Sequence, residues 1–375
     1  MSAADHPAQT QPPRRYRVAI IGTGRMGGLI DDELPAGSSS KPYGHFPAYQ
    51  SIGETEVVAV ANRGRERLER FATRFGVATT YLDYREMIEH EKPDIVSVTT
   101  PSWARAEPVI FAAEHGVRGI YAEKGLCASL AEADRIREAI HRNRVAFNWG
   151  AMRRHHSGYK QLRDAIAAGE IGEPRQLALY FYTDLIKHHP HTLDLASMLL
   201  GDPAAEWVEG RLVEPGDPLA ANSKRPFPTY DAARRRWVPA AGLEIADPMV
   251  GAYRVGYTGG AEASFLPSGR FDVDVVGTKG RAWAWNNGAR FELWRGATAT
   301  EPAFERSIEP AGETPTVCTI RDIIREMEAG ERTAGNIDIT LQSVEVQFGL
   351  AQSHIEGGAR IRLPLADRSL YIPGG

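Results

Sequence analysis

The chain has 375 residues, of which 42% are hydrophobic and 25% are charged, and its formal net charge is −4. This length suits two domains better than one, and the composition is that of an ordinary folded protein. The small negative charge argues against a nucleic-acid binder held by phosphate contacts, and no apolar run reaches the roughly 20 residues that span a bilayer. Two cysteines, Cys127 and Cys318, are too few for a disulfide framework.

Residues 1–15 are polar and rich in proline, which predicts a disordered tail. Arg14 and Arg15 resemble the start of a twin-arginine export signal. The apolar run that follows them, RVAII, is interrupted by glycine too soon for such a signal. We therefore expect a cytoplasmic protein.

Residues 16–150 alternate short apolar runs with amphipathic segments. This alternation predicts a doubly wound α/β domain of the Rossmann type, with a parallel sheet. The expected strands are 17–21, 57–61, 95–99, 118–122 and 145–149, and the expected helices are 65–75, 84–89, 106–115 and 130–142.

Residues 151–375 have a different pattern, with long alternating segments typical of an antiparallel sheet that has one polar face. We expect a second, α+β domain with a mainly antiparallel sheet; the resemblance described below implies that this sheet is large and open and that the domain serves substrate binding and oligomerisation. Residues 217–239 are predicted to form a loop. The expected strands are 177–182, 207–213, 249–257, 261–266, 271–276, 281–285 and 290–294, and the expected helices are 158–169, 190–200 and 341–356.

The first apolar run leads into a glycine loop, Gly22-Thr23-Gly24-Arg25-Met26-Gly27, that we expect to open a helix at once. Gly22 permits a tight turn, Gly24 lets the backbone approach a pyrophosphate, and Gly27 allows close packing of helix on strand. The loop predicts a dinucleotide site that includes Arg25 and Met26. Residues 42–45, further on, either cover the mouth of the site or form a surface insertion.

The end of the second strand favours NADP(H) slightly over NAD(H). A carboxylate at this point binds the ribose 2′-hydroxyl of NAD, whereas an arginine accommodates the 2′-phosphate of NADP. Here Asn62 and Arg63 follow the strand, with Arg65 next to them, and no carboxylate is present. The arginines are otherwise solvated charges at the start of the next helix.

Several further motifs follow in order: 99–102 (TTPS), 123–125 (EKG), 169–174 (GEIGEP), 191–194 (HTLD) and 277–280 (GTKG). Each is weak alone, but the ordered set, from residue 16 to about 365, resembles the Gfo/Idh/MocA family, which includes glucose–fructose oxidoreductase and inositol dehydrogenases. The resemblance implies a tightly held NAD(P), chemistry at a hydroxyl of a sugar or cyclitol, and a homodimer or homotetramer formed through the outer face of the large sheet.

The cofactor site is then expected to extend over Thr100, Pro101, Trp103, Glu123 and Lys124. Trp103 is expected to touch the nicotinamide ribose or the substrate, or else only to pack at the start of a helix.

The resemblance also implies a catalytic set. Lys124 matches the family's lysine at the end of a parallel strand, with Gly125 in place of the usual proline. His191 matches the catalytic histidine, and Asp194 matches the acid three residues later. Hydride transfer from an alcohol needs a base and a positive group that stabilises the alkoxide, so we expect Lys124 to polarise the oxygen and His191 to move the proton. Asp194, one helical turn after His191, is expected to orient its ring.

One position departs from the family pattern. The acidic residue expected four positions before the histidine is Lys187, although Asp184 could replace it. We expect the positive charge of Lys187 to lower the pKa of His191. The neighbouring histidines have no acidic or cysteine partner at helical spacing, so no metal site is predicted.

The substrate is expected to meet four residues, which otherwise are ordinary linker charges: Arg153, Arg154, His155 and His188. The favoured function is NAD(P)-dependent oxidation or reduction at a secondary hydroxyl of a sugar, sugar derivative or cyclitol. One alternative is redox-neutral cleavage of a glycoside through a 3-keto intermediate with recycled NAD(P). The other is an NAD(P)-binding regulator without catalysis.

Overall fold

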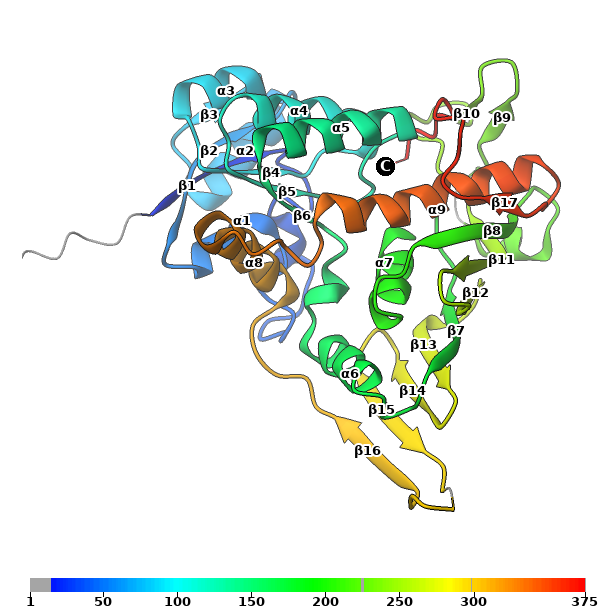
Figure 1. Ribbon diagram of the computed structural model, residues 1–375. Helices are drawn as coiled ribbons and strands as arrows, with labels where there is room; N and C mark the ends of the chain where they lie inside the picture. The colour runs from blue at the N-terminus through cyan, green and yellow to red at the C-terminus, as the bar shows by residue number, and fades with distance from the viewer. Residues whose placement is uncertain (1–14, 224–225, 298, 375) are drawn as a thin grey trace, which may run out of the picture.

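A computed structural model describes residues 15–223, 226–297 and 299–374. The predicted tail, except for Arg15, lies outside these residues. The described chain forms two sheets with helices packed on and between them (Figure 1). No helix in these ranges is both long and apolar enough to cross a membrane.

The N-terminal sheet is parallel, as the sequence predicts, and has six strands in the order β3-β2-β1-β4-β5-β6; the short edge strand β3 was not among the five expected. The order reverses between β1 and β4, and ligands bind at such a reversal outside the carboxyl ends of the strands. The bounds are β1 Tyr16–Ile21, β2 Thr55–Ala61, β3 Thr80–Tyr81, β4 Ile95–Val98, β5 Gly119–Ala122 and β6 Ala146–Trp149.

Four helices cover this sheet: α2 Arg65–Phe75, α3 Tyr84–Glu91, α4 Ala106–Glu114 and α5 Leu130–Asn143. Their ends follow ordinary capping rules. The side chain of Asp83 accepts a hydrogen bond from the Arg85 amide at the start of α3, and Ser129 does the same for α5. Gly76 ends α2 in the left-handed conformation that glycine adopts without strain.

The prediction that the glycine loop opens a helix at once is wrong. A turn at residues 25–28 and a short 3₁₀ helix, η1 (Leu29–Asp32), follow the loop, and the α-helix α1 begins only at His45 and ends at Ser51. The amides of His45 and Phe46 donate to the carbonyls of Met26 and Gly27. Residues 29–44 are therefore an excursion inserted between the first turn and the rest of this helix. Asp31 in this excursion accepts hydrogen bonds from the amides of Tyr43 and Gly44.

The C-terminal half forms the expected open sheet, with nine strands in the order β16-β15-β14-β13-β7-β12-β11-β8-β17. All pairs are antiparallel except β7 with β12. Helices α6 (Ser157–Ala167), α7 (Pro190–Leu199) and α9 (Ile337–Ile355) pack on one face. The strand bounds are β7 Pro174–Phe181, β8 Ala205–Leu212, β11 Val250–Tyr257, β12 Glu262–Leu266, β13 Arg270–Gly277, β14 Gly280–Trp285, β15 Arg290–Arg295, β16 Phe304–Ile308 and β17 Ile361–Arg362.

Two features of this half differ from the prediction. The excursion 217–239 contains a 3₁₀ helix, η4 (Pro218–Asn222), and a two-stranded hairpin, β9 (Thr229–Asp231) with β10 (Arg236–Val238). The helix α8 (Pro315–Ala329) was not expected, and it packs on β5, β6 and α1 of the N-terminal sheet (Figure 1). Ile320 and Ile323 of α8 are fully buried there. The chain beyond residue 150 thus returns to complete the core of the first domain.

Candidate active site

The glycine loop has the geometry of a phosphate-binding turn. Gly22 has φ +101°, and a Cβ there would lie 2.7 Å from the Thr99 hydroxyl. A Cβ on Gly27 would lie 2.5 Å from the Gly22 carbonyl oxygen. A Cβ on Gly24, by contrast, would meet nothing within 4 Å and would occupy open space at the pocket wall. The loop therefore leaves free the space that a pyrophosphate would fill, so its residues fit a dinucleotide.

A pocket of about 740 Å³ opens beside this loop, large enough for an extended nucleotide. Seven of the residues predicted to bind cofactor line it: Gly22, Gly24, Asn62, Arg63, Thr100, Pro101 and Trp103. The other five, Arg25, Met26, Gly27, Glu123 and Lys124, do not line it. The side chain of Arg25 instead forms an ion pair with Glu33, 2.7 Å away.

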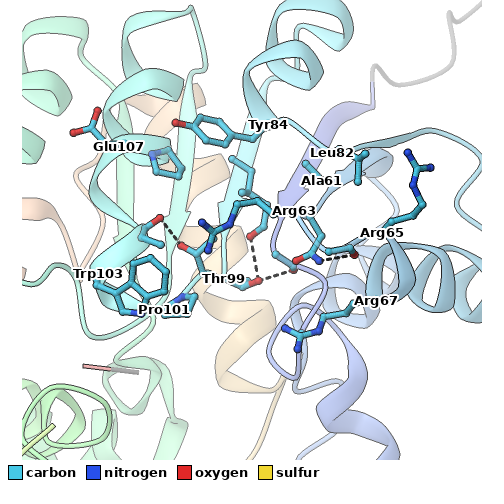
Figure 2. A pocket seen from close by; sticks show the side chains of 18 of the residues that line it. Ala61, Arg63, Arg65, Arg67, Leu82, Tyr84, Thr99, Pro101, Trp103 and Glu107 are labelled. Atoms are coloured by element: carbon cyan, nitrogen blue, oxygen red, sulfur yellow. Dashed lines mark hydrogen bonds between the residues drawn. The ribbon is translucent and has the colours of Figure 1, made fainter. Parts of the chain in front are cut away.

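The end of the pocket next to β2 is strongly basic. Figure 2 shows Arg63 extending toward Trp103 and Pro101, with Arg65 and Arg67 on the opposite side of the pocket. The Arg63 guanidinium lies 5.4 Å from the centre of the Trp103 ring. Sequence reasoning missed three further arginines of the pocket, Arg67, Arg70 and Arg85. Three glutamates also line the pocket, Glu66, Glu107 and Glu244.

Lys124 lies at the carboxyl end of β5 on a buried carboxylate. The Glu123 side chain is 2% exposed, and its Oε2 lies 3.6 Å from Lys124 Nζ. Burial alone would raise the pKa of Glu123, but the opposing charges of Lys124 and His45 hold it at about 2. Burial lowers the pKa of Lys124, and the Glu123 carboxylate offsets part of that change.

A hydrogen-bonded chain leads from this carboxylate into the core, and sequence reasoning missed it. His45 Nε2 lies 3.2 Å from Glu123 Oε1, and His45 Nδ1 lies 2.9 Å from Ser97 Oγ. Ser97 in turn bonds the hydroxyl of Tyr49. The His45 ring also stacks on Tyr121. These contacts fix the carboxylate that faces Lys124.

Gly125 shows why the family's proline is replaced here. A Cβ at this position would lie 2.5 Å from the carbonyl oxygen of Ile186. The segment that carries Asp184, Lys187 and His188 therefore approaches Lys124 more closely than a proline ring would permit.

His191 begins the helix α7 inside the protein, after Pro190. The residue is 6% exposed, and its Nδ1 has no hydrogen-bond partner among the described residues. Burial lowers the pKa of His191 well below 6.5, and the charges of Arg153 and Lys124 lower it further. The imidazole is thus neutral at physiological pH, with a free polar atom close to Lys124.

The structure corrects three expectations: that Asp194 orients the His191 ring, and that Arg154 and His155 contact the substrate. Asp194 does not orient the ring, because its Oδ1 accepts hydrogen bonds from Nε and Nη2 of Arg154 at 3.0 and 2.9 Å. Arg154 is buried and also pairs with Asp202, so two carboxylates already neutralise its charge. His155 is likewise buried, 3.3 Å from the Asn148 amide nitrogen.

Lys187 does not act on His191 as expected. Its positive charge lowers the pKa of Lys124 instead, and its amide donates to Asp247. Asp184, the alternative carboxylate, accepts hydrogen bonds from the amide and the Nδ1 of His188 at 2.9 and 2.8 Å. The Asp184 charge also raises the pKa of Lys124. Asp184 and His188 thus form a pair beside Lys124, with the His188 side chain 40% exposed.

These features define a dinucleotide-binding Rossmann domain joined to an α+β domain, with charged side chains gathered where the two meet. Residues 16–150 match the family model described as "Oxidoreductase family, NAD-binding Rossmann fold", that of Gfo/Idh/MocA. For this N-terminal domain the match confirms the predicted resemblance to the Gfo/Idh/MocA oxidoreductase family.

Curated relatives agree with this assignment. A dTDP-3,4-didehydro-2,6-dideoxy-alpha-D-glucose 3-reductase of Saccharopolyspora spinosa is 33% identical over 136 residues, 36% of this chain and 40% of the relative. A myo-inositol 2-dehydrogenase of Thermotoga maritima is 28% identical over 163 residues, 44% of each chain. The chain thus spans less than half the length of these relatives.

The solved structure of a levoglucosan dehydrogenase with NADH and levoglucosan has the same overall fold. It superposes with a TM-score of 0.73, covering 94% of this chain and all of that one, at 16% identity. At this identity the likeness extends only to the fold.

The glycine loop gives the first prediction. Gly24→Val places a branched side chain in the open space beside the pocket, so the affinity for NAD(P)H should fall by more than about tenfold. Fluorescence titration of the folded variant measures this. Gly53→Val is the matched control, because Gly53 is exposed, lies outside the pocket and also has nothing within 4 Å of its Cβ position. Equal affinities for the two variants would contradict the site.

The buried carboxylate gives a pH prediction. Because the pKa of Glu123 is lowered from 4.5 to about 2, its ionised form stabilises the fold fully above the unfolded pKa. This contribution is lost as the pH falls from about 4.5 toward about 2. The free-energy difference between wild type and Glu123→Gln should therefore be roughly 2 kcal/mol larger at pH 7 than at pH 3. Chemical denaturation at both pH values measures it, with the exposed Glu138→Gln as control. A pH-independent difference would show that Glu123 is not held ionised.

Proposed function

We propose that the protein is an NAD(P)-dependent oxidoreductase that transfers a hydride between the nicotinamide and a secondary hydroxyl of a sugar, sugar derivative or cyclitol. The observation that carries this proposal is a pair of groups with suitable chemistry: Lys124, which follows β5 and lies 3.6 Å from the Glu123 carboxylate, and the buried His191, whose Nδ1 has no partner among the described residues. The names of the curated relatives, a sugar 3-reductase and an inositol dehydrogenase, support the substrate class.

Each residue of the site has a distinct role in the proposed reaction. A bound nicotinamide supplies or accepts the hydride. The Lys124 ammonium stabilises negative charge on the reacting oxygen, and the low dielectric of its surroundings strengthens that interaction. The unpartnered, neutral His191 accepts the hydroxyl proton or returns it. The Asp184–His188 pair lies beside Lys124 and offers a path for that proton toward the exposed His188 edge.

The basic end of the pocket supports NADP(H) as the preferred cofactor. No carboxylate follows β2 at the position that reads a ribose 2′-hydroxyl, and Asn62 there donates to the Gly64 carbonyl. Among the described residues, Arg63, Arg67 and Arg70 have no ion pair, so their charges are available to a 2′-phosphate. An arginine–phosphate pair is charge-assisted and often bidentate.

The homo-oligomer remains part of this proposal. Trp285 and Trp294 are 41% and 40% exposed on the outer face of the large sheet. Apolar area of this kind on a sheet face favours a homodimer or homotetramer.

The cofactor preference has a direct test. Arg63→Ala should weaken NADP(H) binding about tenfold or more and leave NAD(H) binding nearly unchanged, because a charge-assisted hydrogen bond is worth about 1.5–3 kcal/mol. Titration with both cofactors measures the difference. Arg142→Ala removes an equal charge from the surface of α5 and serves as control. A wild type that binds NAD(H) more tightly would overturn the preference.

The catalytic assignment is tested by turnover and its pH dependence. His191→Ala should lower turnover by about 10²–10⁴-fold, the scale of general-base catalysis. Lys124→Met should depress kcat far more than cofactor affinity, with the exposed Lys160→Met as control.

The variant Lys187→Met distinguishes the titration of Lys124 from that of His191. Since Lys187 lowers the pKa of Lys124, its removal should move the limb of the pH–rate profile that belongs to Lys124 toward higher pH, with the His191 limb unchanged. A shift of both limbs would contradict this geometry. Cleavage of a glycoside without accumulation of reduced cofactor would instead favour the redox-neutral alternative.

A further inference from the structure

Arg153 is a cation that lacks a carboxylate partner among the described residues. It belongs to the 3₁₀ helix η3 (Met152–His155), which follows β6. Its Nε and Nη2 donate to the amide oxygen of Asn287 at 3.0 and 2.6 Å, and no ion pair holds it in the part of the chain that the structure describes. Its neighbour Arg154 is held by two carboxylates, those of Asp194 and Asp202. The two adjacent arginines therefore differ in charge balance: two carboxylates neutralise Arg154, whereas no described carboxylate pairs with Arg153.

The Arg153 guanidinium is held in a fixed position by Phe271 and Asn287. The central carbon of the group lies 3.8 Å from the centre of the Phe271 ring, in a cation–π contact. Phe271 has φ +70°, an uncommon conformation for a bulky residue, whereas Asn287 has φ +58°, which asparagine adopts readily in a turn. The backbone amide of Asn287 donates to the Phe271 carbonyl, which links the two residues that hold the guanidinium. Strained backbone of this kind is typically retained where a side chain must be held for binding.

Arg153 lies next to the helix that carries His191. Its neighbour Arg154 in η3 is paired with Asp194, one helical turn after His191 in α7. The positive charge of Arg153 helps to lower the pKa of His191 and offsets part of the rise that burial causes in the pKa of Tyr43. Tyr43 belongs to the 29–44 excursion and is anchored to α8, because the Thr316 hydroxyl donates to its carbonyl oxygen. Arg153 thus lies near elements of both domains, in the space where a substrate would meet His191.

The charges around this space leave Arg153 uncompensated. Glu123 faces Lys124, and Asp184 pairs with His188. The charge of Lys187 acts on Asp247, whose side chain also accepts its amide hydrogen bond. Burial lowers the pKa of Arg153, and the Asp194 carboxylate offsets part of that change, but Asp194 is itself paired with Arg154. A ligand that carries one negative charge would restore the balance.

We infer that Arg153 binds a carboxylate of the substrate, so that the substrate is an acidic sugar or cyclitol derivative such as an aldonate or a uronate. This inference rests on the proposed oxidoreductase function. The Nε–Nη2 edge is used by Asn287, and the remaining N–H groups offer a second edge that matches the two oxygens of a carboxylate. One guanidinium balances the single charge of a carboxylate better than the two charges of a phosphate ester. The proximity of His191 puts the carboxylate near the reacting hydroxyl.

The experiment compares matched substrates on three proteins. Reduction of NAD(P)⁺ is measured for gluconate against glucitol, glucuronate and galacturonate against the corresponding neutral sugars, and glucose 6-phosphate. The proteins are wild type, Arg153→Gln and Arg270→Gln. Arg270 is exposed beside Phe271 in the sequence, so its variant removes an equal charge outside the cleft. Arg153→Lys, which keeps the charge but not the fork, is added in case Arg153→Gln does not fold.

Wild type should prefer a carboxylate to its neutral match by at least about tenfold in kcat/KM. Arg153→Gln should lose about 10- to 100-fold on the acid, through KM, and almost nothing on the neutral match. Arg153→Lys should fall between them, and Arg270→Gln should behave as wild type. Equal use of neutral and acidic substrates, a preference for the phosphate ester, or equal losses on both members of a pair would overturn the inference. The proposed function would fail differently, with no reduction of the cofactor by any polyol.

Discussion

The buried carboxylate of Glu123 is the constraint on which the rest of the site depends. A carboxylate removed from water is costly unless it is paired and hydrogen-bonded. Here Lys124 and His45 satisfy it, and there is no room for a side chain at position 150, where a Cβ would lie 2.9 Å from the carboxylate. His45 belongs to the helix that resumes after the 29–44 excursion, so the glycine loop and the end of β5 are fixed relative to each other. The orientation of Lys124 follows from that arrangement.

The reaction space is assembled from segments that are distant in sequence. The first domain contributes Lys124 and, through its excursion, Tyr43, while Arg153 and His191 come from the chain after β6. Helix α8 returns from the second half to the first sheet and anchors the excursion through the hydroxyls of Thr314 and Thr316. Burial without hydrogen bonding leaves His191 neutral, and burial without a counter-charge leaves Arg153 available to an anion.

The sequence predicts the scaffold well, since mostly apolar runs such as IVSV and alternating runs such as RFDVDVV depend on local burial. It also locates Lys124, His191 and the glycine loop, because each lies at the end of a recognisable element. Sequence patterns do not predict features that depend on contacts between residues distant in the chain. Asp194 has the spacing to reach His191 but meets Arg154, which no local pattern shows. The split helix before His45 and the return of α8 likewise depend on tertiary packing that sequence periodicity does not encode.

The central claim is that a hydride passes between a substrate carbon and a nicotinamide held by this chain. The most direct measurement uses acidic polyols deuterated at their carbinol carbons, with mass spectrometry of the cofactor after incubation. The account predicts deuterium on the nicotinamide ring with wild type, and a strongly reduced rate of labelling when Lys124 or His191 is replaced. Substrate conversion with an unlabelled cofactor, or labelling at an unchanged rate in both variants, would contradict it.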